Sequence, residues 1–216
     1  MRRPYVAQQG TGGEEGGYAH RRMVAVHATP PPFVARVERV SAADLPYSWH
    51  AGCPVAPAQL RRIRLAYIGF DGRRHLGELV VNARVVAPVT TVFRSLYRSR
   101  FPIRRMQPVD AYKGDDDRSA AADNTSAFNC RRAVASGAPS WSMHAYGEAI
   151  DVNDVENPYV FGSRVIPPAG RAFANRAVVR PGMAVAGGVL VRAFASVGWG
   201  WGARFADYQH FSVNGR

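Results

Sequence analysis

The chain has 216 residues, 47% of them hydrophobic, and a formal net charge of +12. The apolar fraction is enough for a packed core and excludes wholesale disorder, while the short, interrupted apolar runs exclude a segment that spans a bilayer. The charge favours encounters with polyanions such as nucleic acid or an anionic cell wall, but the arginines come as scattered pairs without a basic-and-aromatic module, so we expect no specific nucleic-acid partner.

The N-terminal part differs in composition from the rest. Residues 10–17 are rich in Gly and Glu, and three prolines follow at 30–32. We therefore predict a flexible N-terminal extension over residues 1–45 and a globular domain over 46–216. The start of the chain has a positive region without an apolar stretch after it, so no signal peptide is visible.

Two strands and a helix are predicted next. RRIRLAYIGF (61–70) alternates in polarity, Asp71-Gly72 is a hairpin signal, and HLGELVV (75–81) is the partner strand. A helix is predicted over 88–100, because Pro88 suits a first turn and apolar residues follow at helical spacing. These apolar residues are Val89, Val92, Phe93, Leu96 and Tyr97.

The second half of the chain is predicted to alternate between strands and loops, with one more helix. Strands are predicted over 101–112, 147–152 and 207–213, loops over 114–123 and 154–182, and a helix over 187–198. Strands and helices alternate only loosely and the strands include a hairpin. We therefore predict an α+β fold, with a mainly antiparallel sheet and flanking helices.

Two cysteines, Cys53 and Cys130, leave two possibilities open. They form one disulfide, which would suit an oxidising compartment, or they are two buried thiols. Two cysteines alone do not make a structural zinc site.

The stretch SMHAYGEAIDVN (142–153) places His144 seven positions ahead of Asp151. If GEAIDV is a strand, Ile150 and Val152 face the core and Asp151 points to the opposite, open face, where small neighbours leave room. His144 lies just before the strand and can fold over the same spot. The alternative is a surface aspartate with a loop histidine, a common pair in any sequence.

The stretch DYQHF (207–211) near the end of the chain supplies further candidates. Positions three apart on a strand face opposite sides, so Asp207 must lie in the turn that enters the strand if it is to share a site with His210. His144, Asp151 and His210 would then leave an open fourth position on a tetrahedral zinc ion, the pattern of a catalytic site. Asp207, outside the ligand set, could take a proton from the attacking water.

These two motifs carry a resemblance to a known family. SMHAYGEAIDVN resembles the SxHxxGxAxD motif of the zinc D-alanyl-D-alanine carboxypeptidase and L-alanyl-D-glutamate endopeptidase family, the VanY-like and phage-endolysin-like cell-wall peptidases. DYQHF is similar to that family's closing (D/E)xxH motif, and NTSAFNCR (124–131) fits it too. The resemblance runs from about Phe93 to Phe211. It implies a DD-peptidase or hedgehog-like fold with a zinc site on the open face of the sheet, and peptidoglycan peptides as partners.

The resemblance also implies roles for single residues. His144, Asp151 and His210 would bind Zn²⁺, and Asp207 would be the general base that later protonates the leaving amine. The family uses an arginine ahead of the first motif to stabilise the oxyanion. Our first choice for this arginine is Arg131 and our second is Arg118, in the loop after the acidic run. Further candidates for substrate contacts are Ser142, Tyr146 and Trp201.

Taken together, the sequence predicts a monomeric zinc peptidase acting outside the cytoplasm on bacterial cell-wall peptides, with residues 46–216 as its catalytic domain. Carboxypeptidase activity on D-Ala-D-Ala is favoured, and endopeptidase activity on L-Ala-D-Glu is the alternative. An inactive, zinc-stabilised module that binds the wall also stays open.

Overall fold

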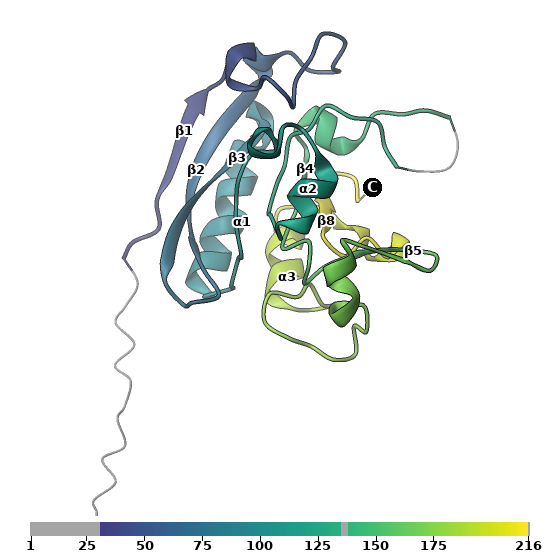
Figure 1. The fold of residues 1–216 in the computed structure, drawn as a ribbon. Coiled ribbons are helices and arrows are strands. Elements are labelled where there is room, and N and C mark those ends of the chain that lie inside the picture. Colours follow the sequence, from purple (N-terminus) through teal and green to yellow (C-terminus); the bar gives the residue numbers. More distant parts are fainter. Residues whose placement is uncertain (1–30, 135–137, 216) are drawn as a thin grey trace, which may run out of the picture.

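A computed structural model describes residues 31–134 and 138–215, and its strands form three antiparallel sheets with the orders β1-β2-β3, β4-β8-β7 and β5-β6 (Figure 1). The strands are β1 (Ala35–Arg39), β2 (Leu60–Ile68), β3 (Arg74–Asn82), β4 (Ala149–Asp151), β5 (Tyr159–Phe161), β6 (Arg164–Ile166), β7 (Gly200–Trp201) and β8 (His210–Ser212). The α-helices are α1 (Val86–Arg98), α2 (Asp116–Ala121) and α3 (Val189–Ala195). The predicted α+β class is confirmed.

The hairpin β2–β3 forms as predicted and packs against α1. Alternation along β2 places Ile63 and Leu65 in the core, while Arg64 points outward and pairs with Glu78 across the hairpin. α1 begins two residues before the predicted start, and all five of its predicted apolar residues are buried. The helix lies along the first sheet in Figure 1, and its apolar stripe is buried in one cluster with residues of β2 and β3.

One continuous core joins this sheet to the second half of the molecule. Ile150 of β4 and Phe211 of β8 belong to the same buried cluster as Phe93 of α1. Phe194 of α3 stacks on Phe211 with ring centroids 4.2 Å apart. The strands that carry the two sequence motifs are therefore fixed on a packed core rather than on loops.

Several predicted elements differ from the structure. Residues 101–112 do not form a regular strand; they make isolated bridges at Pro102 and Met106 and then a 3₁₀ turn, because prolines at 102 and 108 lack the N–H that a strand ladder needs. The predicted loop 114–123 contains α2, with the Asp115 side chain accepting from Arg118 N–H as its N-cap. The predicted loop 154–182 contains the short hairpin β5–β6 and a 3₁₀ segment.

The boundary of the N-terminal extension also lies earlier than residue 45. β1 pairs along its whole length with β2, and Leu45 is fully buried. The last part of the predicted extension is thus an edge strand of the first sheet. The first thirty residues, where flexibility is predicted, lie outside the described residues. Within the described residues, no helix has both the length and the apolar character needed to cross a bilayer.

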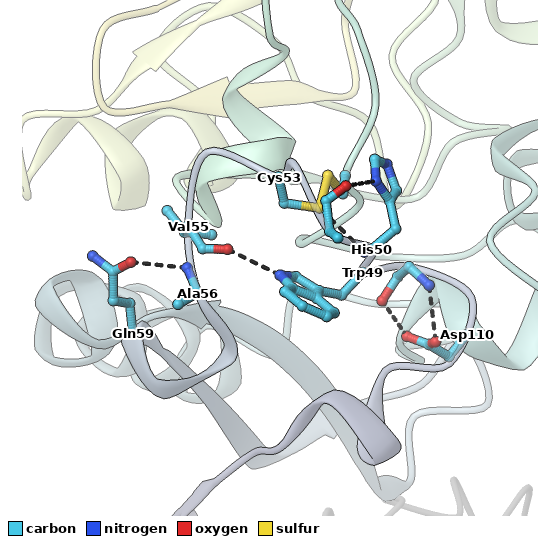
Figure 2. Close-up of a disulfide and its surroundings, with 10 residues drawn as sticks. Trp49, His50, Cys53, Val55, Ala56, Gln59 and Asp110 are labelled. Carbon is cyan, nitrogen blue, oxygen red and sulfur yellow. Dashed lines mark hydrogen bonds between the residues drawn. A yellow bond between two sulfur atoms is a disulfide. The ribbon is translucent and has the colours of Figure 1, made fainter.

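Cys53 and Cys130 are joined by a disulfide across 77 positions of sequence, which decides between the two possibilities that the sequence left open. Figure 2 shows the bond between the loop that carries Trp49 and His50 and the segment behind it. Because the bond closes a long loop of the unfolded chain, the chain-entropy model assigns it about 4 kcal/mol of stabilisation.

We expect the double substitution Cys53→Ser/Cys130→Ser to lower the free energy of unfolding by about 4 kcal/mol. Urea unfolding followed by circular dichroism measures this loss. A reducing agent should lower the stability of the parent chain by a similar amount and leave that of the double variant unchanged. Equal stability of parent and variant in oxidising buffer would contradict the prediction.

Candidate metal centre

His144 lies in the 3₁₀ segment η5 (Met143–Tyr146), which the Ser142 side chain caps by accepting from His144 N–H. Gly147 ends the segment with a φ of 69°, and a Cβ there would lie 2.6 Å from Asn82 N, so the position favours glycine on both counts. The His144 imidazole is buried, and its Nδ1 lies 2.5 Å from the carbonyl oxygen of Ala127. A neutral ring that donates from Nδ1 presents a lone pair at Nε2.

Asp151 and His210 face each other in the sheet. Asp151 ends β4, His210 begins β8, and the two are paired residues of the antiparallel ladder. The His144 Nε2 atom lies 3.1 Å from Asp151 Oδ2 and 3.2 Å from His210 Nδ1, and His210 Nδ1 lies 3.1 Å from Asp151 Oδ1. All three side chains are buried. Among the described residues, they form one of two groups whose ligand atoms lie close enough to hold a metal ion.

The dimensions of this group fit a zinc ion. Zn–N and Zn–O distances of about 2.0–2.1 Å put the corners of a tetrahedron about 3.3 Å apart. The two imidazole nitrogens are 3.2 Å apart, and each lies 3.1 Å from a different oxygen of Asp151. The bond from His144 to the Ala127 carbonyl is the kind of outer contact that orients a metal-binding imidazole. The other group, His50, Cys53 and Cys130, contains both cysteines of the disulfide, whose thiolates are therefore not available as ligands.

Asp207 lies beside the group without belonging to it. The 3₁₀ segment η7 (Gly202–Phe205) ends at Ala206, whose φ is 55°, and Asp207 follows in the turn that enters β8, as predicted. Its Oδ1 atom is buried without a hydrogen-bond partner. Burial raises the pKa of Asp207 to about 6, the Asp151 carboxylate adds to the rise, and His210, His144 and Arg131 oppose it.

The two candidate arginines differ in position. Arg131 pairs through Nε with Asp116. Burial lowers the pKa of Arg131, and Asp151, Asp207 and other carboxylates nearby counteract that lowering, which places its guanidinium within the field of the site. Arg118 is exposed and pairs with Asp115, 3.2 Å away in the same turn. Of the two arginines, Arg131 is thus the one whose charge interacts with the carboxylates of Asp151 and Asp207.

The remaining candidates make local contacts. Ser142 caps the segment of His144. The Tyr146 carbonyl accepts from the Asn82 side chain, and its ring packs on the smaller core cluster around Phe128. Trp201, partly buried at the edge of the main core, donates from Nε1 to the Tyr208 carbonyl oxygen over 2.8 Å. Contacts of Ser142, Tyr146 and Trp201 with substrate stay predictions.

Two buried carboxyl groups near the site were not predicted. Burial raises the pKa of Asp154 well above its usual range, and the carboxylates of Asp151, Asp123 and Asp207 raise it further. Burial and a hydrogen bond with Asp123 raise the pKa of Glu156 to about 8, while Arg104 opposes the rise. Both residues follow the first motif directly, within DVNDVENP, but acidic residues in such a run are usually solvated.

The raised pKa of Glu156 predicts a pH-dependent stability. The folded chain holds the proton up to about pH 8 and the unfolded chain only up to about 4.5, so stability falls as the pH rises between these values. We expect this loss to be on the order of 2 kcal/mol. Glu156→Gln should remove it, as measured by urea unfolding at pH 5 and pH 8. Glu78→Gln, which alters a half-buried glutamate paired with Arg64, is the matched control and should keep the parental slope.

A buried group of two histidines and one carboxylate could hold a metal ion, and with a further carboxylate of raised pKa beside it the group has the ligand types of a catalytic metal site. Residues 136–213 match the family model described as D-alanyl-D-alanine carboxypeptidase, which confirms the predicted family resemblance. This match supports a peptidase of the kind that acts on peptidoglycan. No curated protein matches the chain. No solved structure matches it either.

Proposed function

We propose that this chain is a zinc metallopeptidase that removes the terminal D-alanine from peptidoglycan stem peptides. The observation that carries the proposal is the convergence of His144, Asp151 and His210 on one point, beside a carboxylate, Asp207, that is outside the group. The family match over 136–213 covers all four residues and supports this substrate class. The net charge of +12 would favour approach to an anionic wall.

Each residue of the site has a distinct role in this proposal. His144 and His210 would hold Zn²⁺ through Nε2 and Nδ1, and Asp151 through a carboxylate oxygen. Bound zinc supplies Lewis-acid polarisation of the scissile carbonyl and lowers the pKa of water at the open position. Asp207 would accept the proton of the attacking water and return it to the leaving amine. Arg131 would stabilise the negative charge that develops on the carbonyl oxygen.

The proposed location is outside the cytoplasm. The substrate class of the family lies there, and the Cys53–Cys130 disulfide suits an oxidising compartment. Arg118, Ser142, Tyr146 and Trp201 stay candidates for substrate contacts. Of these, Ser142 and Tyr146 each lie two positions from the ligand His144 in sequence, and Tyr146 and Trp201 are partly exposed.

A digest of purified peptidoglycan tests the proposal. The zinc-loaded chain is incubated with the wall, with and without chelator, and the muropeptides are read by mass spectrometry. We expect a chelator-sensitive loss of the terminal alanine. A cut inside the stem would instead assign endopeptidase activity, and unchanged muropeptides with a zinc-dependent melting temperature would favour a zinc-stabilised binding module. The Asp207→Asn chain serves as the control for a contaminating peptidase.

A further inference from the structure

Arg131 contacts Asp116 through its side chain and Ser142 through its backbone, and its charge interacts with carboxylates of the site. These carboxylates include those of Asp151 and Asp207. The Arg131 Nε pairs with Asp116, whose second oxygen accepts from the Asn129 side chain over 2.6 Å. Its carbonyl oxygen accepts from Ser142 N–H over 3.1 Å, at the start of the first motif. An arginine side chain has many rotamers, so holding it in one orientation beforehand lowers the entropy lost when it stabilises a developing negative charge.

The segment that leads to Arg131 is bonded to the metal motif along most of its length. Ser126 and Asp151 exchange both backbone hydrogen bonds, at 3.0 and 2.9 Å. The Ala127 carbonyl lies 2.5 Å from His144 Nδ1, and Asn129 N–H donates to the His144 carbonyl over 3.2 Å. These bonds fix the backbone relative to the ligands from residue 126 to residue 129, the bond from Ser142 N–H fixes the Arg131 carbonyl, and none of them involves the cysteines.

Cys130, the residue directly before Arg131, is held by the loop that carries Ser48 and Cys53. Cys130 N–H donates to the Ser48 carbonyl over 2.9 Å, and its sulfur is joined to Cys53. The loop that supplies both partners is anchored in turn, because Asp110 accepts from Ser48 N–H and from the Ser48 hydroxyl. Figure 2 shows this loop, with Asp110 at one end and the bond from Trp49 Nε1 to the Val55 carbonyl closing the other.

We infer that the Cys53–Cys130 disulfide, together with Asp116, positions Arg131 at the metal group, so that catalysis depends on the disulfide while metal binding does not. The inference rests on the proposed function for its catalytic part. The disulfide holds the backbone directly before Arg131, and Asp116 holds the side chain. The ligands His144 and Asp151 are held by bonds upstream of Cys130. The enzyme would accordingly reach full activity only where the disulfide can form.

A double-mutant cycle on the full zinc-loaded chain tests the catalytic part, with a synthetic stem pentapeptide ending in D-Ala-D-Ala as substrate. We expect Cys53→Ser/Cys130→Ser to lower kcat by about 10- to 100-fold, the scale of a misplaced catalytic group, with one zinc still bound per chain. When Arg131→Ala is already present, the cysteine substitutions should cost nothing more in kcat. A parallel loss in both backgrounds, or no loss at all, would overturn the inference. Asp116→Asn should reproduce the loss with the disulfide intact.

Two controls separate positioning from general stability. Val89→Ala shortens a buried side chain of α1 and should lower the melting temperature without lowering kcat at 25 °C. If the cysteine variant fails to fold, the disulfide of the folded parent chain can be reduced with a phosphine, and the Arg131→Ala chain treated in the same way. The double-mutant cycle then compares the parent chain and the Arg131→Ala chain, each with the disulfide intact and with the disulfide reduced.

A readout that needs no activity keeps the inference separate from the proposed function. The Arg131 Nε–H resonance in a nitrogen–proton correlation spectrum is assigned by its absence in Arg131→Lys. It should exchange slowly with solvent in the parent chain and at least tenfold faster without the disulfide. Unchanged exchange would overturn the positioning role even if the chain cleaves peptide. If exchange responds as expected but no stem peptide is cleaved, the proposed function fails and the positioning role stands.

Discussion

Replacing Asp207 by asparagine should lower kcat by roughly 10²–10⁴-fold, the usual contribution of a general base, while the chain still binds one zinc ion. The reason lies in the separation of roles within the site. Asp207 lies outside the group formed by His144, Asp151 and His210, yet its Oδ1 atom is buried without a hydrogen-bond partner. Asparagine keeps the volume and removes the basicity. Retained activity would show that another group accepts the proton.

The same substitution, which lowers kcat, should raise the stability of the folded chain. A carboxylate whose pKa is raised by burial destabilises the folded chain at neutral pH. Asp207→Asn removes that charge, so the metal-free variant should melt at a higher temperature than the metal-free parent. A variant that is inactive but more stable could not be explained as misfolded, which makes calorimetry of the metal-free chains the natural companion to the kinetics.

The pH profile of the parent enzyme follows from the same group. A general base works only when it is ionised, so kcat/KM should fall about tenfold per pH unit on the acidic side of the pKa of Asp207. Burial places that pKa at about 6 in the metal-free chain. A bound cation would favour the ionised form and move the limb to lower pH. A limb above pH 7 would point to a different base.

Local sequence patterns predicted the elements that depend on local physics. The β2–β3 hairpin follows from alternation and an Asp-Gly turn, and α1 from an apolar stripe of helical period. α2 is six residues long and opens with an acidic run, whose Asp115 acts as the N-cap rather than as part of a solvated loop. β5 and β6 have three residues each, too few for a period to be visible.

The residues of the candidate site likewise include some that a local sequence pattern predicts and some that it does not. His144 and Asp151 lie on one short segment, so their spacing alone suggests a pair. His210 lies 59 positions from Asp151, and its own motif and the resemblance to a family add it to the site; that its strand pairs with β4 is a finding of the structure. The pairing of Arg131 with Asp116 and the burial of Asp154 come from contacts between distant segments, which a single sequence does not encode locally. The same holds for the disulfide, since the two cysteines lie 77 positions apart.

Replacing Asp151 by asparagine should abolish both turnover and the response of stability to zinc. In the parent chain, zinc at 1,000 times its dissociation constant should stabilise the fold by about 4 kcal/mol, which raises the melting temperature of a domain of this size by about 8–16 °C. In Asp151→Asn the ligand set loses its only anion, and the two histidines are left facing a neutral amide. We therefore expect no zinc-dependent shift in this variant.

The chain contains its own control for this experiment. Asp71 and His75 form an exposed carboxylate–imidazole pair in the β2–β3 hairpin, with His75 Nε2 3.0 Å from Asp71 Oδ1. Asp71→Asn breaks a pair of the same chemistry outside both metal-capable groups of the described residues. Its melting temperature should respond to zinc as that of the parent does. If Asp71→Asn lost the response, or Asp151→Asn kept it, zinc would be binding somewhere other than the group of His144, Asp151 and His210.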